Sequence, residues 1–413
     1  MSDVKRNLQT KLDALLDIFP AVLILGVRQS GKTTLSQQAR PKWKYFDLEN
    51  TKDHDFISRD MDFFFKEYSG QIIIDEAQEY PAIFKQLRGV IDSDREHKNR
   101  FILTGSSSPE LIQHASDSLA GRIGIIELGT LKMNEVNSVP LSSFYEIFNS
   151  EVTNKTITSL KNMTSVDQSK DPIHSFLYGG YPEPVMAKNE TYHSQWMENY
   201  FQLYINRDIK KLYPKLDTVK FRRFISTLSE LSGTIINKAQ LGRSLDVSEV
   251  TARDYLEIAH KTFIWRLIPS YENTASKSIV KMPKGILRDS GLTHFLSNID
   301  SREKLLRSPH VGQNFEAFVI EEIIKGIQCT TATNWNYFYY RTKHGVEVDL
   351  ILEGNFGVVP VEIKFGSNTS SKDLTSLQKF IKDNDLPLGI VINNSSEIAE
   401  ISPQIIQVPV GMI

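Results

Sequence analysis

The sequence is short of the features that mark secreted, membrane-bound or strongly basic proteins. Its 413 residues include one cysteine, Cys329, which excludes an internal disulfide and a zinc site built from several thiolates. No apolar run approaches the ~18 residues of a membrane-spanning helix, and the N-terminus lacks the unbroken apolar core of a signal peptide. The net charge of −2 gives no overall basic field for nucleic acid. We expect a soluble, cytoplasmic protein with no membrane partner.

What is present is an ordinary globular composition, with 40% hydrophobic and 24% charged residues. The length predicts two to four domains. In the first third of the chain, strand-like segments alternate with helical ones, which predicts a parallel sheet covered by helices. These strand-like segments are AVLILG (21–26), KYFDLE (44–49), QIIIDE (71–76), RFILTGSS (100–107) and IGIIEL (123–128).

The segment GVRQSGKTT matches the phosphate-binding P-loop pattern G-x-x-x-x-G-K-[ST] between an apolar strand and a helix. Glycines let successive N–H groups face one concavity, and the helix N-terminus adds positive charge there. Lys32 would reach the β and γ phosphates of ATP, and the Thr33 hydroxyl would bind Mg²⁺. The alternative is a plain glycine turn with a surface lysine, which the full spacing disfavours. The predicted ATP-binding residues here are Gly26, Val27, Arg28, Gln29, Ser30, Gly31, Lys32, Thr33 and Thr34.

Two further strands are expected to end at the same site. In QIIIDE, Asp75 would hold Mg²⁺ and Glu76 would act as the general base on the attacking water. The alternative is a strand followed by a solvated acidic turn. In FILTGSSS, Thr104 or Ser106 would contact the γ-phosphate or the water, whereas the serines before Pro109 could instead cap a helix.

These motifs resemble AAA-type P-loop ATPases of the additional-strand, catalytic-glutamate class. Together with SLAGRI and YINRDI, they are most similar to prokaryotic AAA ATPases that carry a C-terminal domain of unknown function. The resemblance implies ATP binding, slow hydrolysis and a five-stranded parallel sheet. It also implies that Arg122 acts as an arginine finger on a neighbouring subunit, which would require a homo-oligomer. A structural Arg122 paired with a carboxylate is the alternative, and Arg207, beside Asp208, is a second finger candidate.

The middle of the chain is expected to be helical, with a winged-helix-like part. Residues 236–271 predict two helices and a strand, with Ser248 capping the second helix, and the basic stretch 275–285 would form a wing. From Arg207 to Arg288 there are 16 Lys and Arg against 8 Asp and Glu, a net of +8 that favours phosphate binding. The alternative is a packing module, because the second helix exposes acids that would repel DNA: Glu249, Asp254 and Glu257.

The C-terminal segments run helix, three strands, helix, strand. This αβββαβ order resembles the restriction-endonuclease-like, or PD-(D/E)XK, fold, with Glu316 on the first helix, Asp349 on the second strand, and Glu362 and Lys364 on the third. Alternation along a strand puts Glu362 and Lys364 on one face. Asp349 and Glu362 would bind Mg²⁺, with Glu316 completing the acids and Lys364 steadying the scissile phosphate. A hairpin whose charges only face water is the alternative, and nuclease activity stays a separate question.

The prediction is therefore an α/β protein with a P-loop NTPase parallel sheet, a helical and winged-helix middle, and a C-terminal αβββαβ restriction-endonuclease-like domain. Its expected divisions are an AAA-type ATPase core (1–145), a polar connection and helical lid (146–215), a winged-helix-like domain (216–300) and a nuclease-like domain (308–413). Function is expected to be Mg-dependent ATP binding and hydrolysis coupled to nucleic acid. The alternative is a nucleotide-controlled signalling switch or interaction scaffold with an inactive nuclease-like domain.

Overall fold

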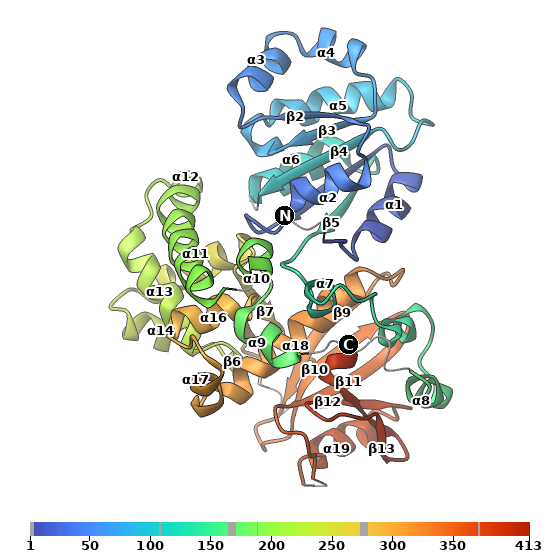
Figure 1. The fold of residues 1–413 in the computed structure, drawn as a ribbon, viewed down its shortest axis with the longest axis vertical. Helices are drawn as coiled ribbons and strands as arrows, with labels where there is room; N and C mark the ends of the chain where they lie inside the picture. The colour runs from blue at the N-terminus through green and yellow to red at the C-terminus, as the bar shows by residue number, and fades with distance from the viewer. Residues whose placement is uncertain (1–3, 107–108, 164–170, 188, 273–279, 371) are drawn as a thin grey trace. The chain divides into compact units, whose positions relative to one another are not determined.

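The computed structural model of the protein describes residues 4–106, 109–163, 171–187, 189–272, 280–370 and 372–413. The chain divides into two compact units (Figure 1). The N-terminal unit comprises residues 5–130 with 261–263, and the C-terminal unit comprises residues 1–4, 131–260 and 264–413.

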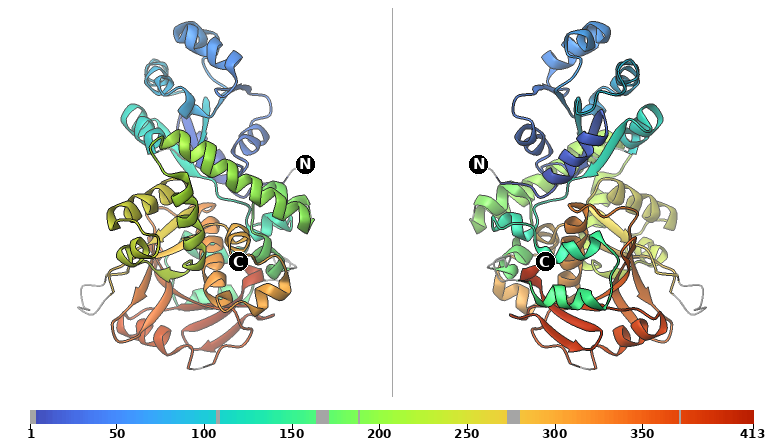
Figure 2. Two further views of the ribbon diagram at one scale, coloured as in Figure 1. Left: turned by 90° about the vertical axis from the view of Figure 1, so that its left-hand side faces the viewer. Right: turned by 90° about the vertical axis from the view of Figure 1, so that its right-hand side faces the viewer.

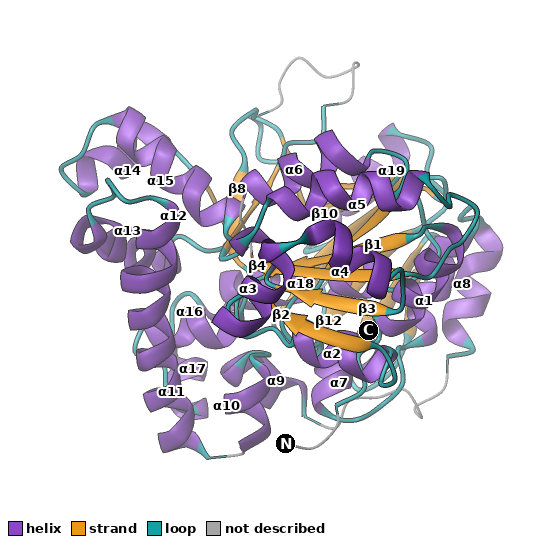
Figure 3. Ribbon diagram, turned by 90° about the horizontal axis from the view of Figure 1, so that it is seen from above, coloured by secondary structure: helices purple, strands orange, loops and turns teal. Residues whose placement is uncertain are grey.

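A five-stranded sheet forms the centre of the N-terminal unit, and β1, β2, β3 and β4 are labelled in Figure 3. Its order is β2-β3-β4-β1-β5, and all four pairings are parallel, so the predicted parallel sheet is confirmed. Every residue of β1 is buried, because helices cover both faces of the sheet. A strand in this position is continuously apolar, as AVLILG is. The strands are β1 (Ala21–Gly26), β2 (Lys44–Asp47), β3 (Ile72–Asp75), β4 (Phe101–Ser106) and β5 (Ile123–Glu127).

Helices cover both faces of this sheet. Leu23 and Leu25 of β1 share a core with residues of the later helices of the unit, such as Phe84 and Leu111. The first two helices pack beside each other and contact β1. The helices are α1 (Gln9–Ile18), α2 (Lys32–Ala39), α3 (Thr51–Arg59), α4 (Met61–Glu67), α5 (Ala82–Asp92) and α6 (Pro109–Leu119), with the 3₁₀ turn η1 (Ala77–Glu79).

The first half of the C-terminal unit is helical, as predicted. Its elements are α7 (Met133–Val136), η2 (Ser143–Asn149), α8 (Asn154–Lys161), α9 (Pro172–Tyr178), α10 (Pro182–Ala187), α11 (Glu190–Leu203), the π-helical η4 (Tyr204–Ile209) and α12 (Lys210–Leu212). The polar stretch expected to be only a connection contains α8. Thr153 caps this helix, and its buried residues Ile157 and Leu160 belong to the hydrophobic core.

A small three-stranded antiparallel sheet, ordered β6-β8-β7, follows among further helices. The elements are α13 (Thr218–Glu230), β6 (Thr234–Ile235), α14 (Lys238–Ser244), α15 (Glu249–Lys261), β7 (Trp265–Ile268), β8 (Lys284–Leu287), α16 (Ser290–Leu296) and α17 (Arg302–Arg307). The predicted cap is confirmed, because the Ser248 hydroxyl accepts a hydrogen bond from the Thr251 N–H at 3.0 Å. Of the predicted wing, residues 275–279 lie outside the described residues.

The C-terminal sheet is mixed and six-stranded, with the order β13-β14-β12-β11-β10-β9. Its strands are among the orange and red arrows of Figure 2. The predicted succession of helix, three strands, helix and strand is present, and two unpredicted strands follow it. The strand β13 is a polar, largely exposed edge strand. It lacks the apolar alternation from which a strand is predicted. The elements are α18 (Val311–Gln328), β9 (Asn336–Arg341), β10 (Glu347–Gly354), β11 (Gly357–Lys364), α19 (Thr375–Asp383), β12 (Gly389–Asn393), β13 (Ala399–Ser402), β14 (Ile405–Pro409) and η5 (Val410–Met412).

The boundary of the N-terminal unit at Thr130 lies earlier than the expected domain end at residue 145. The Leu131 N–H donates to the Gly180 carbonyl at 2.7 Å, and the buried Lys132 ammonium reaches Glu322 on α18 at 3.1 Å. The chain is therefore anchored in the C-terminal unit as soon as it leaves the N-terminal one. Within the described ranges, no helix combines the length and apolarity needed to cross a lipid bilayer.

Buried His294 on α16 is expected to make stability depend on pH. Burial lowers the pKa of His294 from 6.5 to about 4. Between pH 6.5 and pH 4, His294 is therefore protonated in the unfolded chain but neutral in the folded chain. The free energy of unfolding should fall by about 2 kcal/mol between pH 7.5 and pH 5 through this residue. Urea unfolding at both pH values should show a loss about 2 kcal/mol larger in the wild type than in His294→Gln. His310→Gln, at a side chain that is 45% exposed, should behave like the wild type. An equal loss in His294→Gln would contradict the assignment.

Candidate functional site

The P-loop follows β1 and leads into α2 at the carboxyl edge of the parallel sheet. A Cβ on Gly26 would lie 2.2 Å from the Leu128 carbonyl oxygen, so only glycine fits there. Gly31 has a φ of 92° and Gln29 a φ of 65°, both in the left-handed region. The loop therefore takes the tight backbone conformation that a phosphate cradle requires.

Lys32 is buried at the start of α2 and lies across this loop. Its ammonium donates to the carbonyl oxygens of Gly26 and Val27, each at 3.1 Å. Arg28 instead pairs with Glu49 at 3.2 Å, and Thr34 is exposed. Within the described part of the chain, the buried Ser30 hydroxyl has no hydrogen-bond partner. The Lys32 ammonium, which is predicted to bind phosphate, thus contacts carbonyl oxygens of the P-loop itself.

Asp75 joins three of the strands at the end of β3. Its carboxylate accepts hydrogen bonds from the Thr33 hydroxyl and from the Tyr45 hydroxyl, each at 2.7 Å, and from Thr104. The predicted pair Asp75 and Thr33 is therefore in direct contact. A carboxylate beside a hydroxyl is a hard oxygen donor set that suits Mg²⁺, so the residues fit the ion that the ATPase resemblance implies.

Glu76, the next residue, has a φ of 52°, which is uncommon for a residue with a side chain and points to a functional constraint. Its carboxylate accepts from the Ser106 hydroxyl at 2.7 Å, from the Ser106 N–H at 3.2 Å, and from Gln78. Burial acts to raise the pKa of Glu76, but Lys32 and these hydrogen bonds outweigh it, and the pKa lies below the usual value. Glu76 is thus an ionised hydrogen-bond acceptor.

Three residues around this site were not predicted from the sequence. Tyr45 contacts Asp75 because β2 and β3 are neighbours, and Gln78 lies two residues beyond the QIIIDE segment. Buried Arg6 donates to the Ser30 carbonyl at 2.7 Å and to the Gly129 carbonyl at 2.9 Å. No local signal points to Arg6, which supports the loop backbone from the beginning of the chain.

The predicted arginine finger, Arg122, makes two hydrogen bonds to Asp92, at 2.7 and 3.0 Å. It precedes β5, whose first residue pairs with Ala21 at the opposite end of β1 from the P-loop. That separation is roughly 17 Å along the strand, so Arg122 does not reach the site of its own chain. The second candidate, Arg207, lies 3.8 Å from Asp208.

The basic excess in the middle of the chain is partly neutralised inside the C-terminal unit. Arg266 and Lys284 are buried, and their partners are Glu321 and Glu316 on α18. Arg288 also lies 3.5 Å from Glu321. The net charge counted between residues 207 and 288 therefore overstates what faces solvent.

The residues predicted to form a nuclease-like site lie together on α18, β10 and β11. Asp349 accepts a 2.8 Å hydrogen bond from the Ile363 N–H, Lys364 lies 2.6 Å from Glu362, and Glu316 pairs with Lys284. Burial and then the charge of Asp349 raise the pKa of Glu316 and of Glu362, each to about 8. On the hairpin itself, Asp349 and Glu362 are buried, so the alternative of a hairpin whose charges only face water does not describe them.

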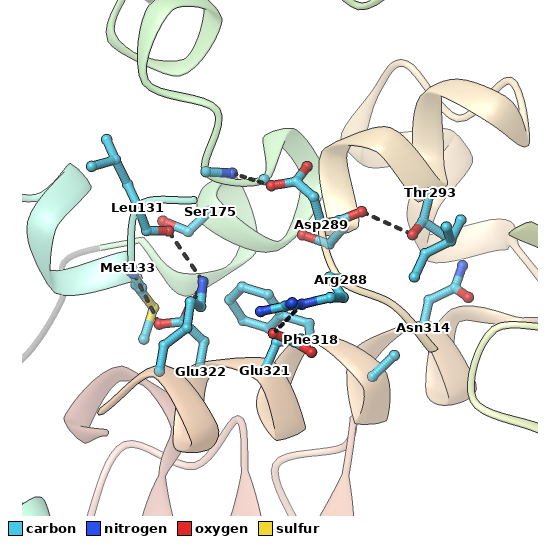
Figure 4. Close-up of a pocket in the computed structure, with 16 residues that line it drawn as sticks. Leu131, Met133, Ser175, Arg288, Asp289, Thr293, Asn314, Phe318, Glu321 and Glu322 are labelled. Carbon is cyan, nitrogen blue, oxygen red and sulfur yellow. Dashed lines mark hydrogen bonds and ion pairs between the residues drawn. The ribbon is translucent and has the colours of Figure 1, made fainter. Parts of the chain in front are cut away.

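A separate pocket within the C-terminal unit is shown in Figure 4. Its charged lining residues have partners within the unit: Arg288 lies 3.5 Å from Glu321, and Asp289 accepts a hydrogen bond from the Gly180 N–H at 2.9 Å. The hydroxyls of Ser175 and Ser290 are buried there without a partner in the described structure. Because these charged groups already have partners within the protein, we interpret the pocket as a structural polar network.

Comparison with protein families divides the chain in a similar way. An AAA domain matches residues 19–137, and two domains of unknown function, DUF8612 and DUF4143, match residues 170–303 and 311–413. The AAA-type domain and the C-terminal domain of unknown function are thus confirmed. A P-loop ATPase domain implies nucleotide binding.

Among solved structures, the Walker-type ATPase PABY2304 of Pyrococcus abyssi is 15% identical with a TM-score of 0.44, covering 71% of this chain and 96% of that one. The RuvB Holliday junction branch migration motor of Thermotoga maritima is 17% identical with a TM-score of 0.30, covering 64% and 89%. Neither similarity is high enough to carry a function across.

Two curated relatives are similar over almost the whole sequence. They are the uncharacterized proteins Mb2031c of Mycobacterium bovis and Rv2008c of Mycobacterium tuberculosis. Each is 30% identical over 413 residues, covering 99% of this chain and 84% of the relative. With its AAA domain and its C-terminal domain of unknown function, the chain belongs to the family of these mycobacterial proteins.

Proposed function

We propose that the protein is a Mg-dependent ATPase that binds and hydrolyses ATP at the P-loop. The observation that carries this proposal is the contact of Thr33 with Asp75 beside the ionised Glu76. A hydroxyl and a carboxylate would hold Mg²⁺ on the phosphate side of the loop, while Glu76 would orient and deprotonate the attacking water. When bound, Mg²⁺ supplies charge neutralisation for the leaving phosphate.

Lys32 would exchange its partners when ATP binds. Its ammonium now satisfies the Gly26 and Val27 carbonyls, and the β and γ phosphates would offer it stronger, charged acceptors. Ser106 and Gln78 hold the Glu76 carboxylate in a fixed orientation. The Thr104 hydroxyl donates a hydrogen bond to Asp75 and accepts one from the Glu76 N–H, and it would hold both acids in position.

We further infer that the nucleotide state changes how the C-terminal unit engages nucleic acid. The support is a set of exposed cations on the helices of the middle region and in the turn between α12 and α13: Lys210, Lys211, Lys215, Lys220, Arg223 and Arg243. Such cations bind phosphates, and that binding weakens steeply with salt. In this proposal Asp349, Glu362 and Lys364 contact the nucleic acid backbone, with or without cleaving it.

The test measures binding and cleavage of plasmid and single-stranded DNA with Mg²⁺ or Mn²⁺, with and without ATP, in the wild type and three variants. Lys32→Ala should lose ATP binding and any ATP effect on DNA. Any cleavage that the wild type shows should be lost in Glu362→Ala and in Lys364→Ala, and both variants should keep ATP binding. If DNA binding has no salt dependence, or if Lys32→Ala leaves the ATP effect on DNA intact, the coupling to nucleic acid is wrong.

A second candidate function is a nucleotide-controlled switch or interaction scaffold whose nuclease-like end is inactive. The favouring observation is that Lys284 and Lys364 already pair with Glu316 and Glu362. Carboxylates with internal partners have less need of a metal. Absence of cleavage under every metal condition, together with intact ATP binding, would favour this candidate.

A further inference from the structure

Lys284 reaches from one sheet of the C-terminal unit into the acidic cluster of another. It begins β8 in the three-stranded sheet, and its side chain is 2% exposed. Its ammonium pairs with Glu316 on α18, lies 3.6 Å from Glu347 on β10, and stands 5.5 Å from the centre of the Tyr339 ring. A buried lysine is rare unless an opposite charge holds it.

The acids around it form a cluster that needs positive charge. Asp349 and Glu362 are buried, and the side chain of Glu316 is 14% exposed. Lys364 forms an ion pair with Glu362 at 2.6 Å, and Arg341 forms one with Glu347 at 3.4 Å. Without Lys284, Glu316 would be a largely buried carboxylate beside Asp349 with no ion-pair partner among the described residues.

A divalent cation would ordinarily balance such a set, but the arrangement here does not fit one. Oxygens of Glu316 and Glu362 already bind ammonium groups, and Asp349 binds a backbone N–H. In the portion of the chain that the structure describes, no group of three or more His, Cys, Asp or Glu side chains could hold a metal ion. One oxygen, Oε2 of Glu362, is buried with no hydrogen-bond partner among the described residues.

We propose that the Lys284 ammonium is the resident cation of the Glu316, Asp349 and Glu362 cluster, taking the role of a divalent metal, and that its removal exposes a latent divalent-cation site. The unsatisfied Glu362 oxygen is the acceptor left for that incoming cation. The same ion pair connects β8 to α18. Lys284 would therefore both occupy the place of a metal ion and stabilise the packing of these two elements. This inference goes beyond the ATPase and rests on neither its activity nor its substrate.

The experiment compares thermal unfolding of the wild type, Lys284→Met and Lys281→Met in EDTA and in a Mn²⁺ series without nucleotide. Lys281 is 76% exposed and pairs with Glu272, so it is the matched control for losing a lysine charge. Lys284→Met should melt several degrees lower in EDTA, and Mn²⁺ should raise its midpoint. The wild type and Lys281→Met should share one small, common response to Mn²⁺. The Mn²⁺ response of Lys284→Met should disappear when Asp349→Asn is added.

Two results would overturn the proposal. One is a folded Lys284→Met that responds to Mn²⁺ no more than the control does. The other is a wild type whose Mn²⁺ response is lost in Asp349→Asn, since metal would then bind with Lys284 in place. If Lys284→Met does not fold, Lys284→Met with Glu316→Gln removes both charges and should restore folding. Failure of that double variant to do better would show that Lys284 acts by packing and not by charge.

Discussion

Glu76→Gln should lower ATP turnover by about 10²–10⁴-fold while ATP still binds, because the amide cannot accept a proton from the attacking water. The variant keeps the size of the side chain and an oxygen that can accept from Ser106 and Gln78. Turnover is measured by phosphate release, and binding by titration of a fluorescent ATP analogue with Mg²⁺.

The matched control is Glu67→Gln, an exposed carboxylate at the end of α4 in the same unit, whose turnover should equal that of the wild type. Unchanged turnover in Glu76→Gln would remove Glu76 from the chemistry and leave the site as a binding switch. Loss of ATP binding in the same variant would instead mean that the residue shapes the loop.

Glu322→Gln should lower the free energy of unfolding by about 3–5 kcal/mol, because it leaves a buried ammonium unpaired. Glu322 is 1% exposed and lies 3.1 Å from Lys132, 2.6 Å from Lys325, and 2.9 Å from the Met133 N–H. Burial opposes ionisation, but Lys132 and Lys325 outweigh it and lower the pKa of Glu322 from 4.5 to about 2. The stabilisation is therefore present above pH 4.5 and is lost as the pH falls towards 2.

Urea unfolding at neutral pH measures the difference, and repeating it at pH 4 and pH 3 measures the acid dependence. Glu303→Gln is the control, since Glu303 is 70% exposed and pairs with Arg307 at 2.9 Å within one helix. Such a surface pair contributes about 0.3–0.5 kcal/mol. A Glu322→Gln effect as small as that of the control would mean that the network does not hold α7 to α18.

Much of the N-terminal unit could be predicted from the sequence, because its signals are local. The P-loop residues are consecutive, and Asp75 and Glu76 directly follow an apolar strand, so spacing alone brings them to one edge of a parallel sheet. The order of the C-terminal elements was likewise readable from alternation and helical period, up to the polar edge strand β13. Glu362 and Lys364 share a face because they are two residues apart on β11.

The partners of these residues could not be predicted in the same way. Arg122 was expected to act on a neighbouring subunit, and within its own chain it binds Asp92. The basic middle region was expected to face nucleic acid, and three of its cations are turned inward to Glu316 and Glu321. A count of charges along a sequence does not reveal which of them are buried or paired.

The sequence by itself determined the chemistry of the phosphate-binding edge, because adjacent residues and a regular strand place those groups wherever the chain folds. Only the tertiary structure decided which charges balance each other. Lys132 meets Glu322 across 190 residues of chain, and Lys284 meets Glu316 across 32. Such pairs form when separate elements pack and exclude water, and the resulting cost of an unpaired buried charge then selects the partner.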